Sequence, residues 1–423
     1  MRSFHRCTLA ACALLLGLTS SAKDKDLLKT RQLQKARTEV WDAWCQTLTQ
    51  QDTLPRMSLA SLETGAVCQW TLPAALEPHA IMNFRSGTKG AKPEAGWPVY
   101  LYLHGSGPRE SEWSTGWQLA KAFDDAPSFY VIPQIPNEAQ YYRWWQQSKQ
   151  WAWQHLLYQL LATSDVDPAR LYIFGISEGG YGSQRLASYY ADYLAGAAPM
   201  AGGEPLRNAP TENLCQTAFS LVTGDKDAGF YRNQLTQRTA ERLDSLAAGT
   251  PGEYTHRVML EPGKGHHITY SVSTPWLKEH NRKAQPRHFR WENFEMDGVK
   301  RNAFYNLEVL REETTDRYDY EMTLEGNTLH LEINRVEYLT TERDPHWGIE
   351  LNHTRRYHPA RHGKVRIYVS EELVRLDQPL SVHVNGKLMG HFPIQLHRSI
   401  LCQSCQLFGD PLRLFPAAIE VEW

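Results

Sequence analysis

Short apolar runs alternate with stretches of helical periodicity through the middle of the chain. The apolar runs predict buried strands at residues 99–103, 129–133, 171–174, 194–200, 218–224 and 256–261. Between them, apolar positions with helical spacing predict helices near residues 144–161, 178–191 and 231–247. Strands that alternate with helices in this way form a parallel sheet with helices on both faces. The predicted fold class of residues 98–285 is therefore α/β.

The pattern changes after a polar, basic stretch at residues 280–290, which is typical of a linker. Beyond it, segments such as NTLHLEINRVEYLTT and GKVRIYVSEELV alternate apolar and polar residues, and Asn385-Gly386 is a hairpin signal. No comparable helical pattern follows, so no helix is expected there. Residues 286–423 are therefore predicted to form a separate β-rich domain, a small sandwich.

Residues 23–97 precede the central domain. A charged, amphipathic helix is predicted from residue 23 to about residue 50, and we expect it to pack on the central domain. Two extended pieces follow at AVCQWTLP and HAIMNFRSG. The region is thus predicted to be an N-terminal helix with an extended lead-in.

The first 22 residues have the pattern of a signal peptide, with a basic start, an apolar run over residues 7–18 and small residues at 20 and 22. We predict cleavage after Ala22 and a secreted or periplasmic location. The alternative is a lipoprotein anchored at Cys12. The run is shorter than the roughly 20 apolar residues that span a bilayer, and no later segment replaces it, so no transmembrane segment is predicted.

The charge balance and the cysteine content indicate which classes of partner and cofactor to expect. With 45 basic and 47 acidic residues, the formal net charge of -2 gives no reason to expect a nucleic-acid partner. The cysteines beyond residue 22 are Cys45, Cys68, Cys215, Cys402 and Cys405. Cys402 and Cys405 lack a second such pair, so no metal site is predicted. Disulfides that leave one thiol over are expected instead, with their connectivity open.

The segment Gly175-Ile176-Ser177-Glu178-Gly179 has the form G-x-S-x-G and lies between a predicted strand and a predicted helix. Small residues on either side allow the central residue to adopt strained backbone angles and to project above the sheet. Ser177 is therefore the candidate nucleophile, and the alternative is an ordinary turn.

A serine hydroxyl needs fixed donors for the oxyanion that forms when it attacks a carbonyl group. The segment His104-Gly105-Ser106-Gly107 follows the first long strand and has the form of an oxyanion loop. We predict that a backbone N–H near Gly105 or Ser106 acts together with the N–H of Glu178.

The nucleophile also needs a base, and the base needs a carboxylate that orients it. In the loop GDKD, we prefer Asp227 to Asp225 because Asp227 lies farther from the strand end. In the loop GKGHH, we prefer His266, which follows a glycine directly, to His267. With Ser177, these residues give the chain order Ser, Asp, His, each on a loop after a strand. Both choices between neighbours stay open.

The motifs LHGSG, GISEGGYG, TGDKD and PGKGHHITY give residues 98–282 a resemblance to the α/β-hydrolase superfamily, and within it to secreted bacterial esterases related to polyhydroxybutyrate depolymerases and feruloyl or acetylxylan esterases. The β-rich tail resembles C-terminal modules of such hydrolases more weakly. The resemblance implies ester hydrolysis through an acyl-serine intermediate, without cofactor or metal, in which Ser177 is the nucleophile, His266 the base and Asp227 its orienting group. The chain departs from many members at Ser106, where they have glycine, and at Glu178.

The segment YYRWWQQSKQWAWQHLL is rich in aromatic residues, and Arg143 and Trp145 are the candidate substrate contacts in it. The leading hypothesis is a secreted serine esterase for a small-molecule or polymer-borne ester, with an acylated carbohydrate as one such substrate. One alternative is a serine peptidase of the prolyl oligopeptidase type. Another is a non-catalytic binding module on a hydrolase scaffold.

Overall fold

The computed structural model describes residues 26–423. The predicted signal peptide over residues 1–22, with cleavage at Ala22 and the alternative lipid anchor at Cys12, lies outside the described residues. Among the residues that are described, no helix combines the length and the apolar composition needed to cross a membrane.

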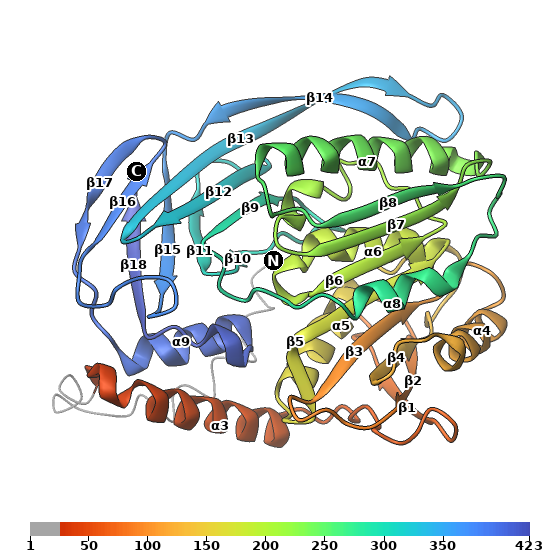
Figure 1. Cartoon of the computed structure of the whole chain (residues 1–423), viewed down its shortest axis with the longest axis horizontal. Helices are drawn as coiled ribbons and strands as arrows, with labels where there is room; N and C mark the ends of the chain where they lie inside the picture. Colours follow the sequence, from red (N-terminus) through yellow and green to blue (C-terminus); the bar gives the residue numbers. More distant parts are fainter. Residues whose placement is uncertain (1–25) are drawn as a thin grey trace.

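The central domain is built on an eight-stranded sheet (Figure 1). Its strands are β1 Ala66–Thr71, β2 Ile81–Lys89, β3 Trp97–Leu103, β4 Ser128–Pro133, β5 Val166–Ile176, β6 Gly196–Met200, β7 Ala218–Gly224 and β8 His256–Glu261. The strand order is β1-β2-β4-β3-β5-β6-β7-β8. β2 is antiparallel to both of its neighbours, and every pair from β4 to β8 is parallel. All six predicted strands are present, and the two extended lead-in pieces join the sheet as β1 and β2.

Helices cover both faces of this sheet, which confirms the predicted α/β fold (Figure 1). α4 Arg109–Ala122 and α8 Ser273–Leu277 pack on one face, and α5 Gln147–Leu161, α6 Glu178–Tyr189 and α7 Arg232–Gly249 pack on the other. Every residue of β4 and β7 is buried, which explains why these strands are continuous apolar runs in the sequence. Helix α4 was not predicted from the sequence, because RESEWSTGWQLAKA is polar at most positions.

Short 3-10 helices lie in the connections and near both ends of the chain. They are η2 Thr30–Gln32, η3 Ala139–Tyr141, η4 Ala191–Tyr193, η5 Thr211–Leu214, η6 Gly229–Tyr231, η7 Tyr270–Val272 and η8 Pro411–Arg413.

The C-terminal part is β-rich, as predicted, and consists of two sheets. Its strands are β9 His288–Asn293, β10 Ala303–Phe304, β11 Leu307–Glu312, β12 Tyr318–Glu325, β13 Thr328–Arg343, β14 Glu350–Pro359, β15 Gly363–Val369, β16 Leu380–Val384, β17 Lys387–Phe392 and β18 Ala417–Glu422. One sheet has the order β10-β11-β15-β18, and the other has the order β17-β16-β13-β12-β9 with β14 paired to β13. Apolar side chains from both sheets share one core, which gives a sandwich-like domain.

One helix contradicts the expectation of a helix-free C-terminal part. α9 Arg398–Phe408 buries Leu401, Ser404, Cys405 and Phe408, which lie three, one and three residues apart on one helical face. The segment is short and has only four buried positions, so its helical periodicity in the sequence is weak. The expectation of no helix in residues 286–423 was therefore wrong.

The N-terminal helix, α3 Leu33–Gln51, packs mainly against α9 rather than on the central domain as expected. Its buried residues belong to the same apolar core as the C-terminal sheets. Trp44 also reaches α5, with its ring centroid 5.7 Å from that of Tyr158. Arg37 Nε donates a hydrogen bond of 3.0 Å to the carbonyl oxygen of Leu414. The two ends of the described chain thus stabilise each other.

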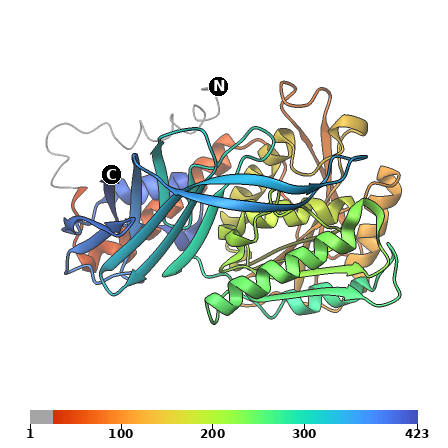
Figure 2. The same ribbon diagram turned by 90° about the horizontal axis from the view of Figure 1, so that it is seen from above.

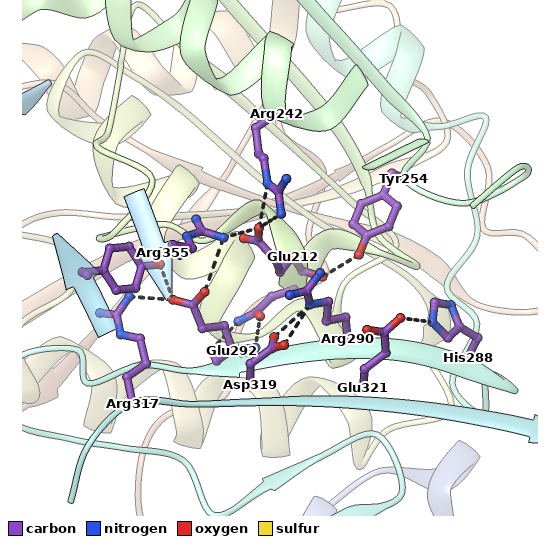
Figure 3. Close-up of polar contacts among 12 residues, drawn as sticks. Glu212, Arg242, Tyr254, His288, Arg290, Glu292, Arg317, Asp319, Glu321 and Arg355 are labelled. Carbon is purple, nitrogen blue, oxygen red and sulfur yellow. Dashed lines mark hydrogen bonds and ion pairs between the residues drawn. The ribbon is translucent and has the colours of Figure 1, made fainter. Parts of the chain in front are cut away.

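Buried ion pairs join the central and C-terminal domains (Figure 3). Glu212, which is fully buried in η5, accepts hydrogen bonds of 2.8 and 2.6 Å from Arg242 of α7 and contacts Arg355 of β14. Within the C-terminal domain, Arg317 donates to Glu292 of β9 over 2.7 Å, and it also donates to the carbonyl oxygen of Arg207 in the central domain over 2.8 Å. Burial opposes ionisation, yet Arg355 and Arg242 hold the pKa of Glu212 below its usual value. Breaking such a pair typically costs about 3–5 kcal/mol, so the network fixes how the domains meet.

Candidate active site

Ser177 lies at the sharp turn between β5 and α6 with a left-handed backbone, φ 57° and ψ -114°. Its N–H donates to the carbonyl oxygen of Met200 over 3.0 Å. A Cβ atom on Gly179 would lie 1.9 Å from the carbonyl oxygen of Leu103, and one on Gly175 would lie 2.4 Å from that of Gly179. Only glycine fits at these two positions, because backbone atoms occupy the space that a side chain needs.

The side chains of the three predicted site residues lie in one hydrogen-bonded line. Ser177 Oγ is 3.0 Å from His266 Nε2, and His266 Nδ1 is 2.7 Å from Asp227 Oδ2. Asp227 is 4% exposed, whereas Asp225 and His267 are exposed to solvent. The structure therefore brings Asp227 and His266 to the serine and leaves their two neighbours outside this contact.

Arg232 contacts the other oxygen of the Asp227 carboxylate, which the sequence analysis did not predict. Its Nη1 donates to Asp227 Oδ1 over 3.0 Å and to the carbonyl oxygen of Gly229 over 3.1 Å. The two oxygens of Asp227 thus have separate partners, His266 and Arg232. The sequence signal was a single arginine five residues after the aspartate, at the start of a predicted helix.

A buried histidine, His104, anchors the loop after β3 through hydrogen bonds. His104 Nδ1 lies 2.7 Å from the carbonyl oxygen of Gly105, and His104 Nε2 accepts from the N–H of Ile135 over 3.1 Å. Tyr142 also donates to the Gly105 oxygen, over 2.6 Å. Burial lowers the pKa of His104 to about 4, so the ring is neutral and its Nδ1–H donates. Ser106, the next residue, is exposed at the surface of this loop.

Glu178 begins α6, where first-turn N–H groups have no acceptor within the helix. Its carboxyl is buried, and its Oε1 lies 3.4 Å from Nη1 of Arg143, whose side chain is 49% exposed. Burial raises the pKa of Glu178 to about 7, against the opposing effect of Arg143. Of the two candidate substrate contacts, Arg143 therefore lies beside the residue that follows the serine.

Trp145, the other candidate contact, is half-buried beneath Arg185, whose guanidinium carbon is 3.8 Å from the ring centroid. Arg185 is itself paired with Glu204 over 2.6 Å. Trp144 is fully buried and belongs to the core of the central domain. The aromatic segment thus contributes to both the core and the surface near the site.

One group of side chains has the donor atoms of a metal site. Cys215 Sγ is 3.0 Å from Glu253 Oε2 and 3.6 Å from His288 Nδ1. His288 also contacts Glu321 over 3.3 Å, and the contacts with Cys215, Glu253 and Glu321 raise its pKa to about 12 although burial opposes this. His288 thus has two carboxylate partners, Glu253 and Glu321, in addition to the thiol of Cys215.

At least three thiols are free among the described residues, so the expectation that only one thiol is left over was wrong. Cys45, Cys68 and Cys215 are free thiols. Burial raises the pKa of Cys45 and of Cys68 to about 11, which makes these two thiols poor nucleophiles at neutral pH.

Comparison with known proteins adds one related sequence. No family model matches the chain. Poly(3-hydroxyalkanoate) depolymerase C of Paucimonas lemoignei is 29% identical over 155 residues, which are 34% of this chain and 36% of that protein. The chain thus matches about a third of the length of this curated relative. Over this stretch, the chain is similar in sequence to that depolymerase.

Similar solved structures include a thermostable esterase with 18% identity and a TM-score of 0.39, covering 52% of this chain and 64% of that one. A poly(3-hydroxybutyrate) depolymerase from Bordetella parapertussis has 14% identity and a TM-score of 0.36, covering 48% and 84%. An acetyl xylan esterase from Aspergillus awamori has 10% identity and a TM-score of 0.36, covering 50% and 99%.

Proposed function

We propose that this chain is a serine hydrolase that cleaves carboxylic esters, with Ser177 as the nucleophile, His266 as the base and Asp227 as the group that orients it. The observation that carries the proposal is the line of hydrogen bonds of 3.0 and 2.7 Å from Ser177 through His266 to the buried Asp227. The related depolymerase sequence supports the same class of reaction.

In the proposed reaction, Ser177 Oγ attacks the carbonyl carbon of the ester while His266 Nε2 takes the hydroxyl proton. Backbone N–H groups of Glu178 and of the loop at Gly105 and Ser106 stabilise the oxyanion. The C–O bond to the alcohol then breaks, and the alcohol leaves with the proton from His266. Water attacks the acyl-serine with the same imidazole as base, which releases the acid and restores Ser177.

The proposed substrate is an ester carried by a small molecule or a polymer, and an acylated carbohydrate is one candidate. No cofactor, metal or nucleic acid takes part in the proposed reaction. The predicted signal peptide supports a secreted or periplasmic site of action.

A fluorophosphonate probe tests the nucleophile, because it reacts only with an activated serine. We expect the wild-type protein to be labelled at Ser177 and Ser177→Ala to remain folded but unlabelled. Turnover of an ester should fall by several orders of magnitude in that variant. Labelling of Ser177→Ala at wild-type rate would refute the assignment.

A substrate panel separates the esterase from the peptidase alternative. We expect p-nitrophenyl esters to be hydrolysed with a kcat/KM far above that for amino-acyl p-nitroanilides. The opposite preference would favour a peptidase of the prolyl oligopeptidase type. Absence of both activities, together with absence of labelling, would favour a binding module.

A further inference from the structure

A long hairpin leaves the C-terminal domain and crosses the central domain. The first half of β13 pairs with β12 and β16, whereas residues 336–343 pair only with β14. Figures 1 and 2 show this β13–β14 arm reaching the end of the molecule at which β7 and β8 end. The carboxyl ends of parallel strands form the edge where ligands bind in α/β proteins. The arm therefore brings a segment of the C-terminal domain to the edge that carries Ser177.

Polar contacts fix the arm along its length. Glu350 of β14 forms an ion pair of 2.9 Å with Arg207 of the central domain and, within the arm, accepts a hydrogen bond of 2.6 Å from Thr340. The guanidinium carbon of Arg207 also lies 4.8 Å from the ring centroid of Tyr338. Together with the Arg355 to Glu212 pair at the domain junction, these contacts hold the arm against the central domain.

The tip of the arm, residues 344–349, contacts the loop that follows Asp227. Tyr231 donates a hydrogen bond of 2.8 Å to Asp344 Oδ1, and the rings of Phe230 and Trp347 lie 5.0 Å apart at 58°. Phe230 and Tyr231 both have left-handed backbones, with φ of 54° and 59°. Such conformations cost about 1–3 kcal/mol each and persist where their surroundings hold them. The tip is one of those surroundings.

The aromatic pair at this contact stays open to solvent. Trp347 is 59% exposed and Phe230 is 44% exposed. The pair adjoins the candidate active site, because the guanidinium carbon of Arg232 lies 5.2 Å from the Phe230 ring and its Nη1 binds Asp227. The two rings therefore offer exposed apolar surface beside the candidate active site.

We propose that Trp347 and Phe230 form an accessory binding site for the aliphatic part of the ester substrate. This inference rests on the proposed esterase function. The carboxylate of Asp344 is taken up by Tyr231 and by the N–H of Trp347, so it offers little to sugar hydroxyl groups. The two tilted rings present no single flat face for a sugar, whereas a flexible alkyl chain can follow both. The arm thus gives the C-terminal domain a part in substrate selection.

Trp347→Ala tests the inference through the chain-length preference of the enzyme. We expect the ratio of kcat/KM for p-nitrophenyl decanoate to that for p-nitrophenyl acetate to fall about tenfold, within the range of apolar pocket discrimination. Trp347→Phe should retain most of the ratio. A matched pair of decyl acetate and ethyl acetate shows whether the alkyl group belongs to the alcohol side instead. A fall in either ratio supports the site, and no change in both overturns it.

Two further variants control this experiment. Leu388→Ala removes an apolar side chain that is 45% exposed on β17 and should leave both ratios unchanged. Asp344→Ala breaks the contact of the tip with Tyr231 and should lower the same ratio as Trp347→Ala. Because Trp347 is mostly exposed, thermal unfolding of Trp347→Ala should match the wild type.

The outcomes distinguish this inference from the proposed function. A wild-type protein that is unlabelled by fluorophosphonate and hydrolyses no ester refutes both. A wild-type protein that is labelled and active, with ratios that Trp347→Ala does not change, refutes the accessory site alone.

Discussion

Backbone geometry holds Ser177, whereas side-chain contacts hold Asp227. The serine turn is fixed by neighbours in the chain and by two adjacent strands, where glycines at 175 and 179 leave no room for a side chain. The carboxylate of Asp227 depends on Arg232, and its loop depends on Asp344 from another domain. A distant change can therefore disturb the Asp227 side of the site while the serine turn keeps its geometry.

The largest effect in this comparison is expected at the carboxylate itself. Asp227→Asn should lower kcat by about 10⁴, because an amide in place of the carboxylate holds His266 in the wrong tautomer. Asp225→Asn is the matched control, and it should change kcat by less than about threefold, since Asp225 is exposed. The reverse order of effects would assign the role to Asp225.

On the serine side, Gly179→Ala should disrupt the turn. The new Cβ would lie 1.9 Å from a backbone carbonyl oxygen, so the turn must move at a cost of about 1–3 kcal/mol or more. Gly249→Ala, where a Cβ meets nothing within 4 Å, is the control. Chemical denaturation compares the two variants, and equal stability would show that the turn can relax.

Arg232→Gln should have a smaller effect, because it disturbs only the Asp227 half of the site and leaves the serine turn intact. Loss of a hydrogen bond between charged groups is worth about 1.5–3 kcal/mol, so kcat should fall roughly 10- to 100-fold. KM for p-nitrophenyl acetate should change little, and Arg232→Lys should recover part of kcat. A change in KM with kcat intact would instead place Arg232 in substrate binding.

The smallest expected effect is a change in the pH dependence of kcat/KM when Glu178 is replaced by glutamine. Because its pKa is raised to about 7, the carboxyl is neutral below that pH and charged above it, beside the proposed oxyanion donors. We expect kcat/KM of the wild type to fall a few-fold above pH 7, and Glu178→Gln to lack this fall. The raised pKa also means that the unfolded chain ionises first as pH rises, so stability is lost toward pH 7. Glu178→Gln should therefore stabilise the fold more at pH 8 than at pH 5.

The sequence was informative where the structure depends on near neighbours. The serine turn follows from five consecutive residues, and the buried parallel strands follow from uninterrupted apolar runs. The contacts of Tyr231 with Asp344 and of Phe230 with Trp347 join residues more than 110 positions apart, with no local pattern. In the sequence, nothing distinguishes Arg232 from the other arginines, because its contact with Asp227 forms only when the loop folds. Long-range side-chain contacts of this kind become visible only when the chain has folded.

Because α3 packs on α9, the N-terminal helix can complete its native packing only after α9 has been synthesised. Arg37 binds the carbonyl of Leu414 across 377 positions of sequence, and the apolar face of α3 is covered mainly by α9 and the C-terminal core. A ribosome makes α3 long before it makes α9, so the apolar face of the nascent helix waits for its native partner. For a chain that we propose to be exported, this delay postpones complete folding until the C-terminal region has been synthesised.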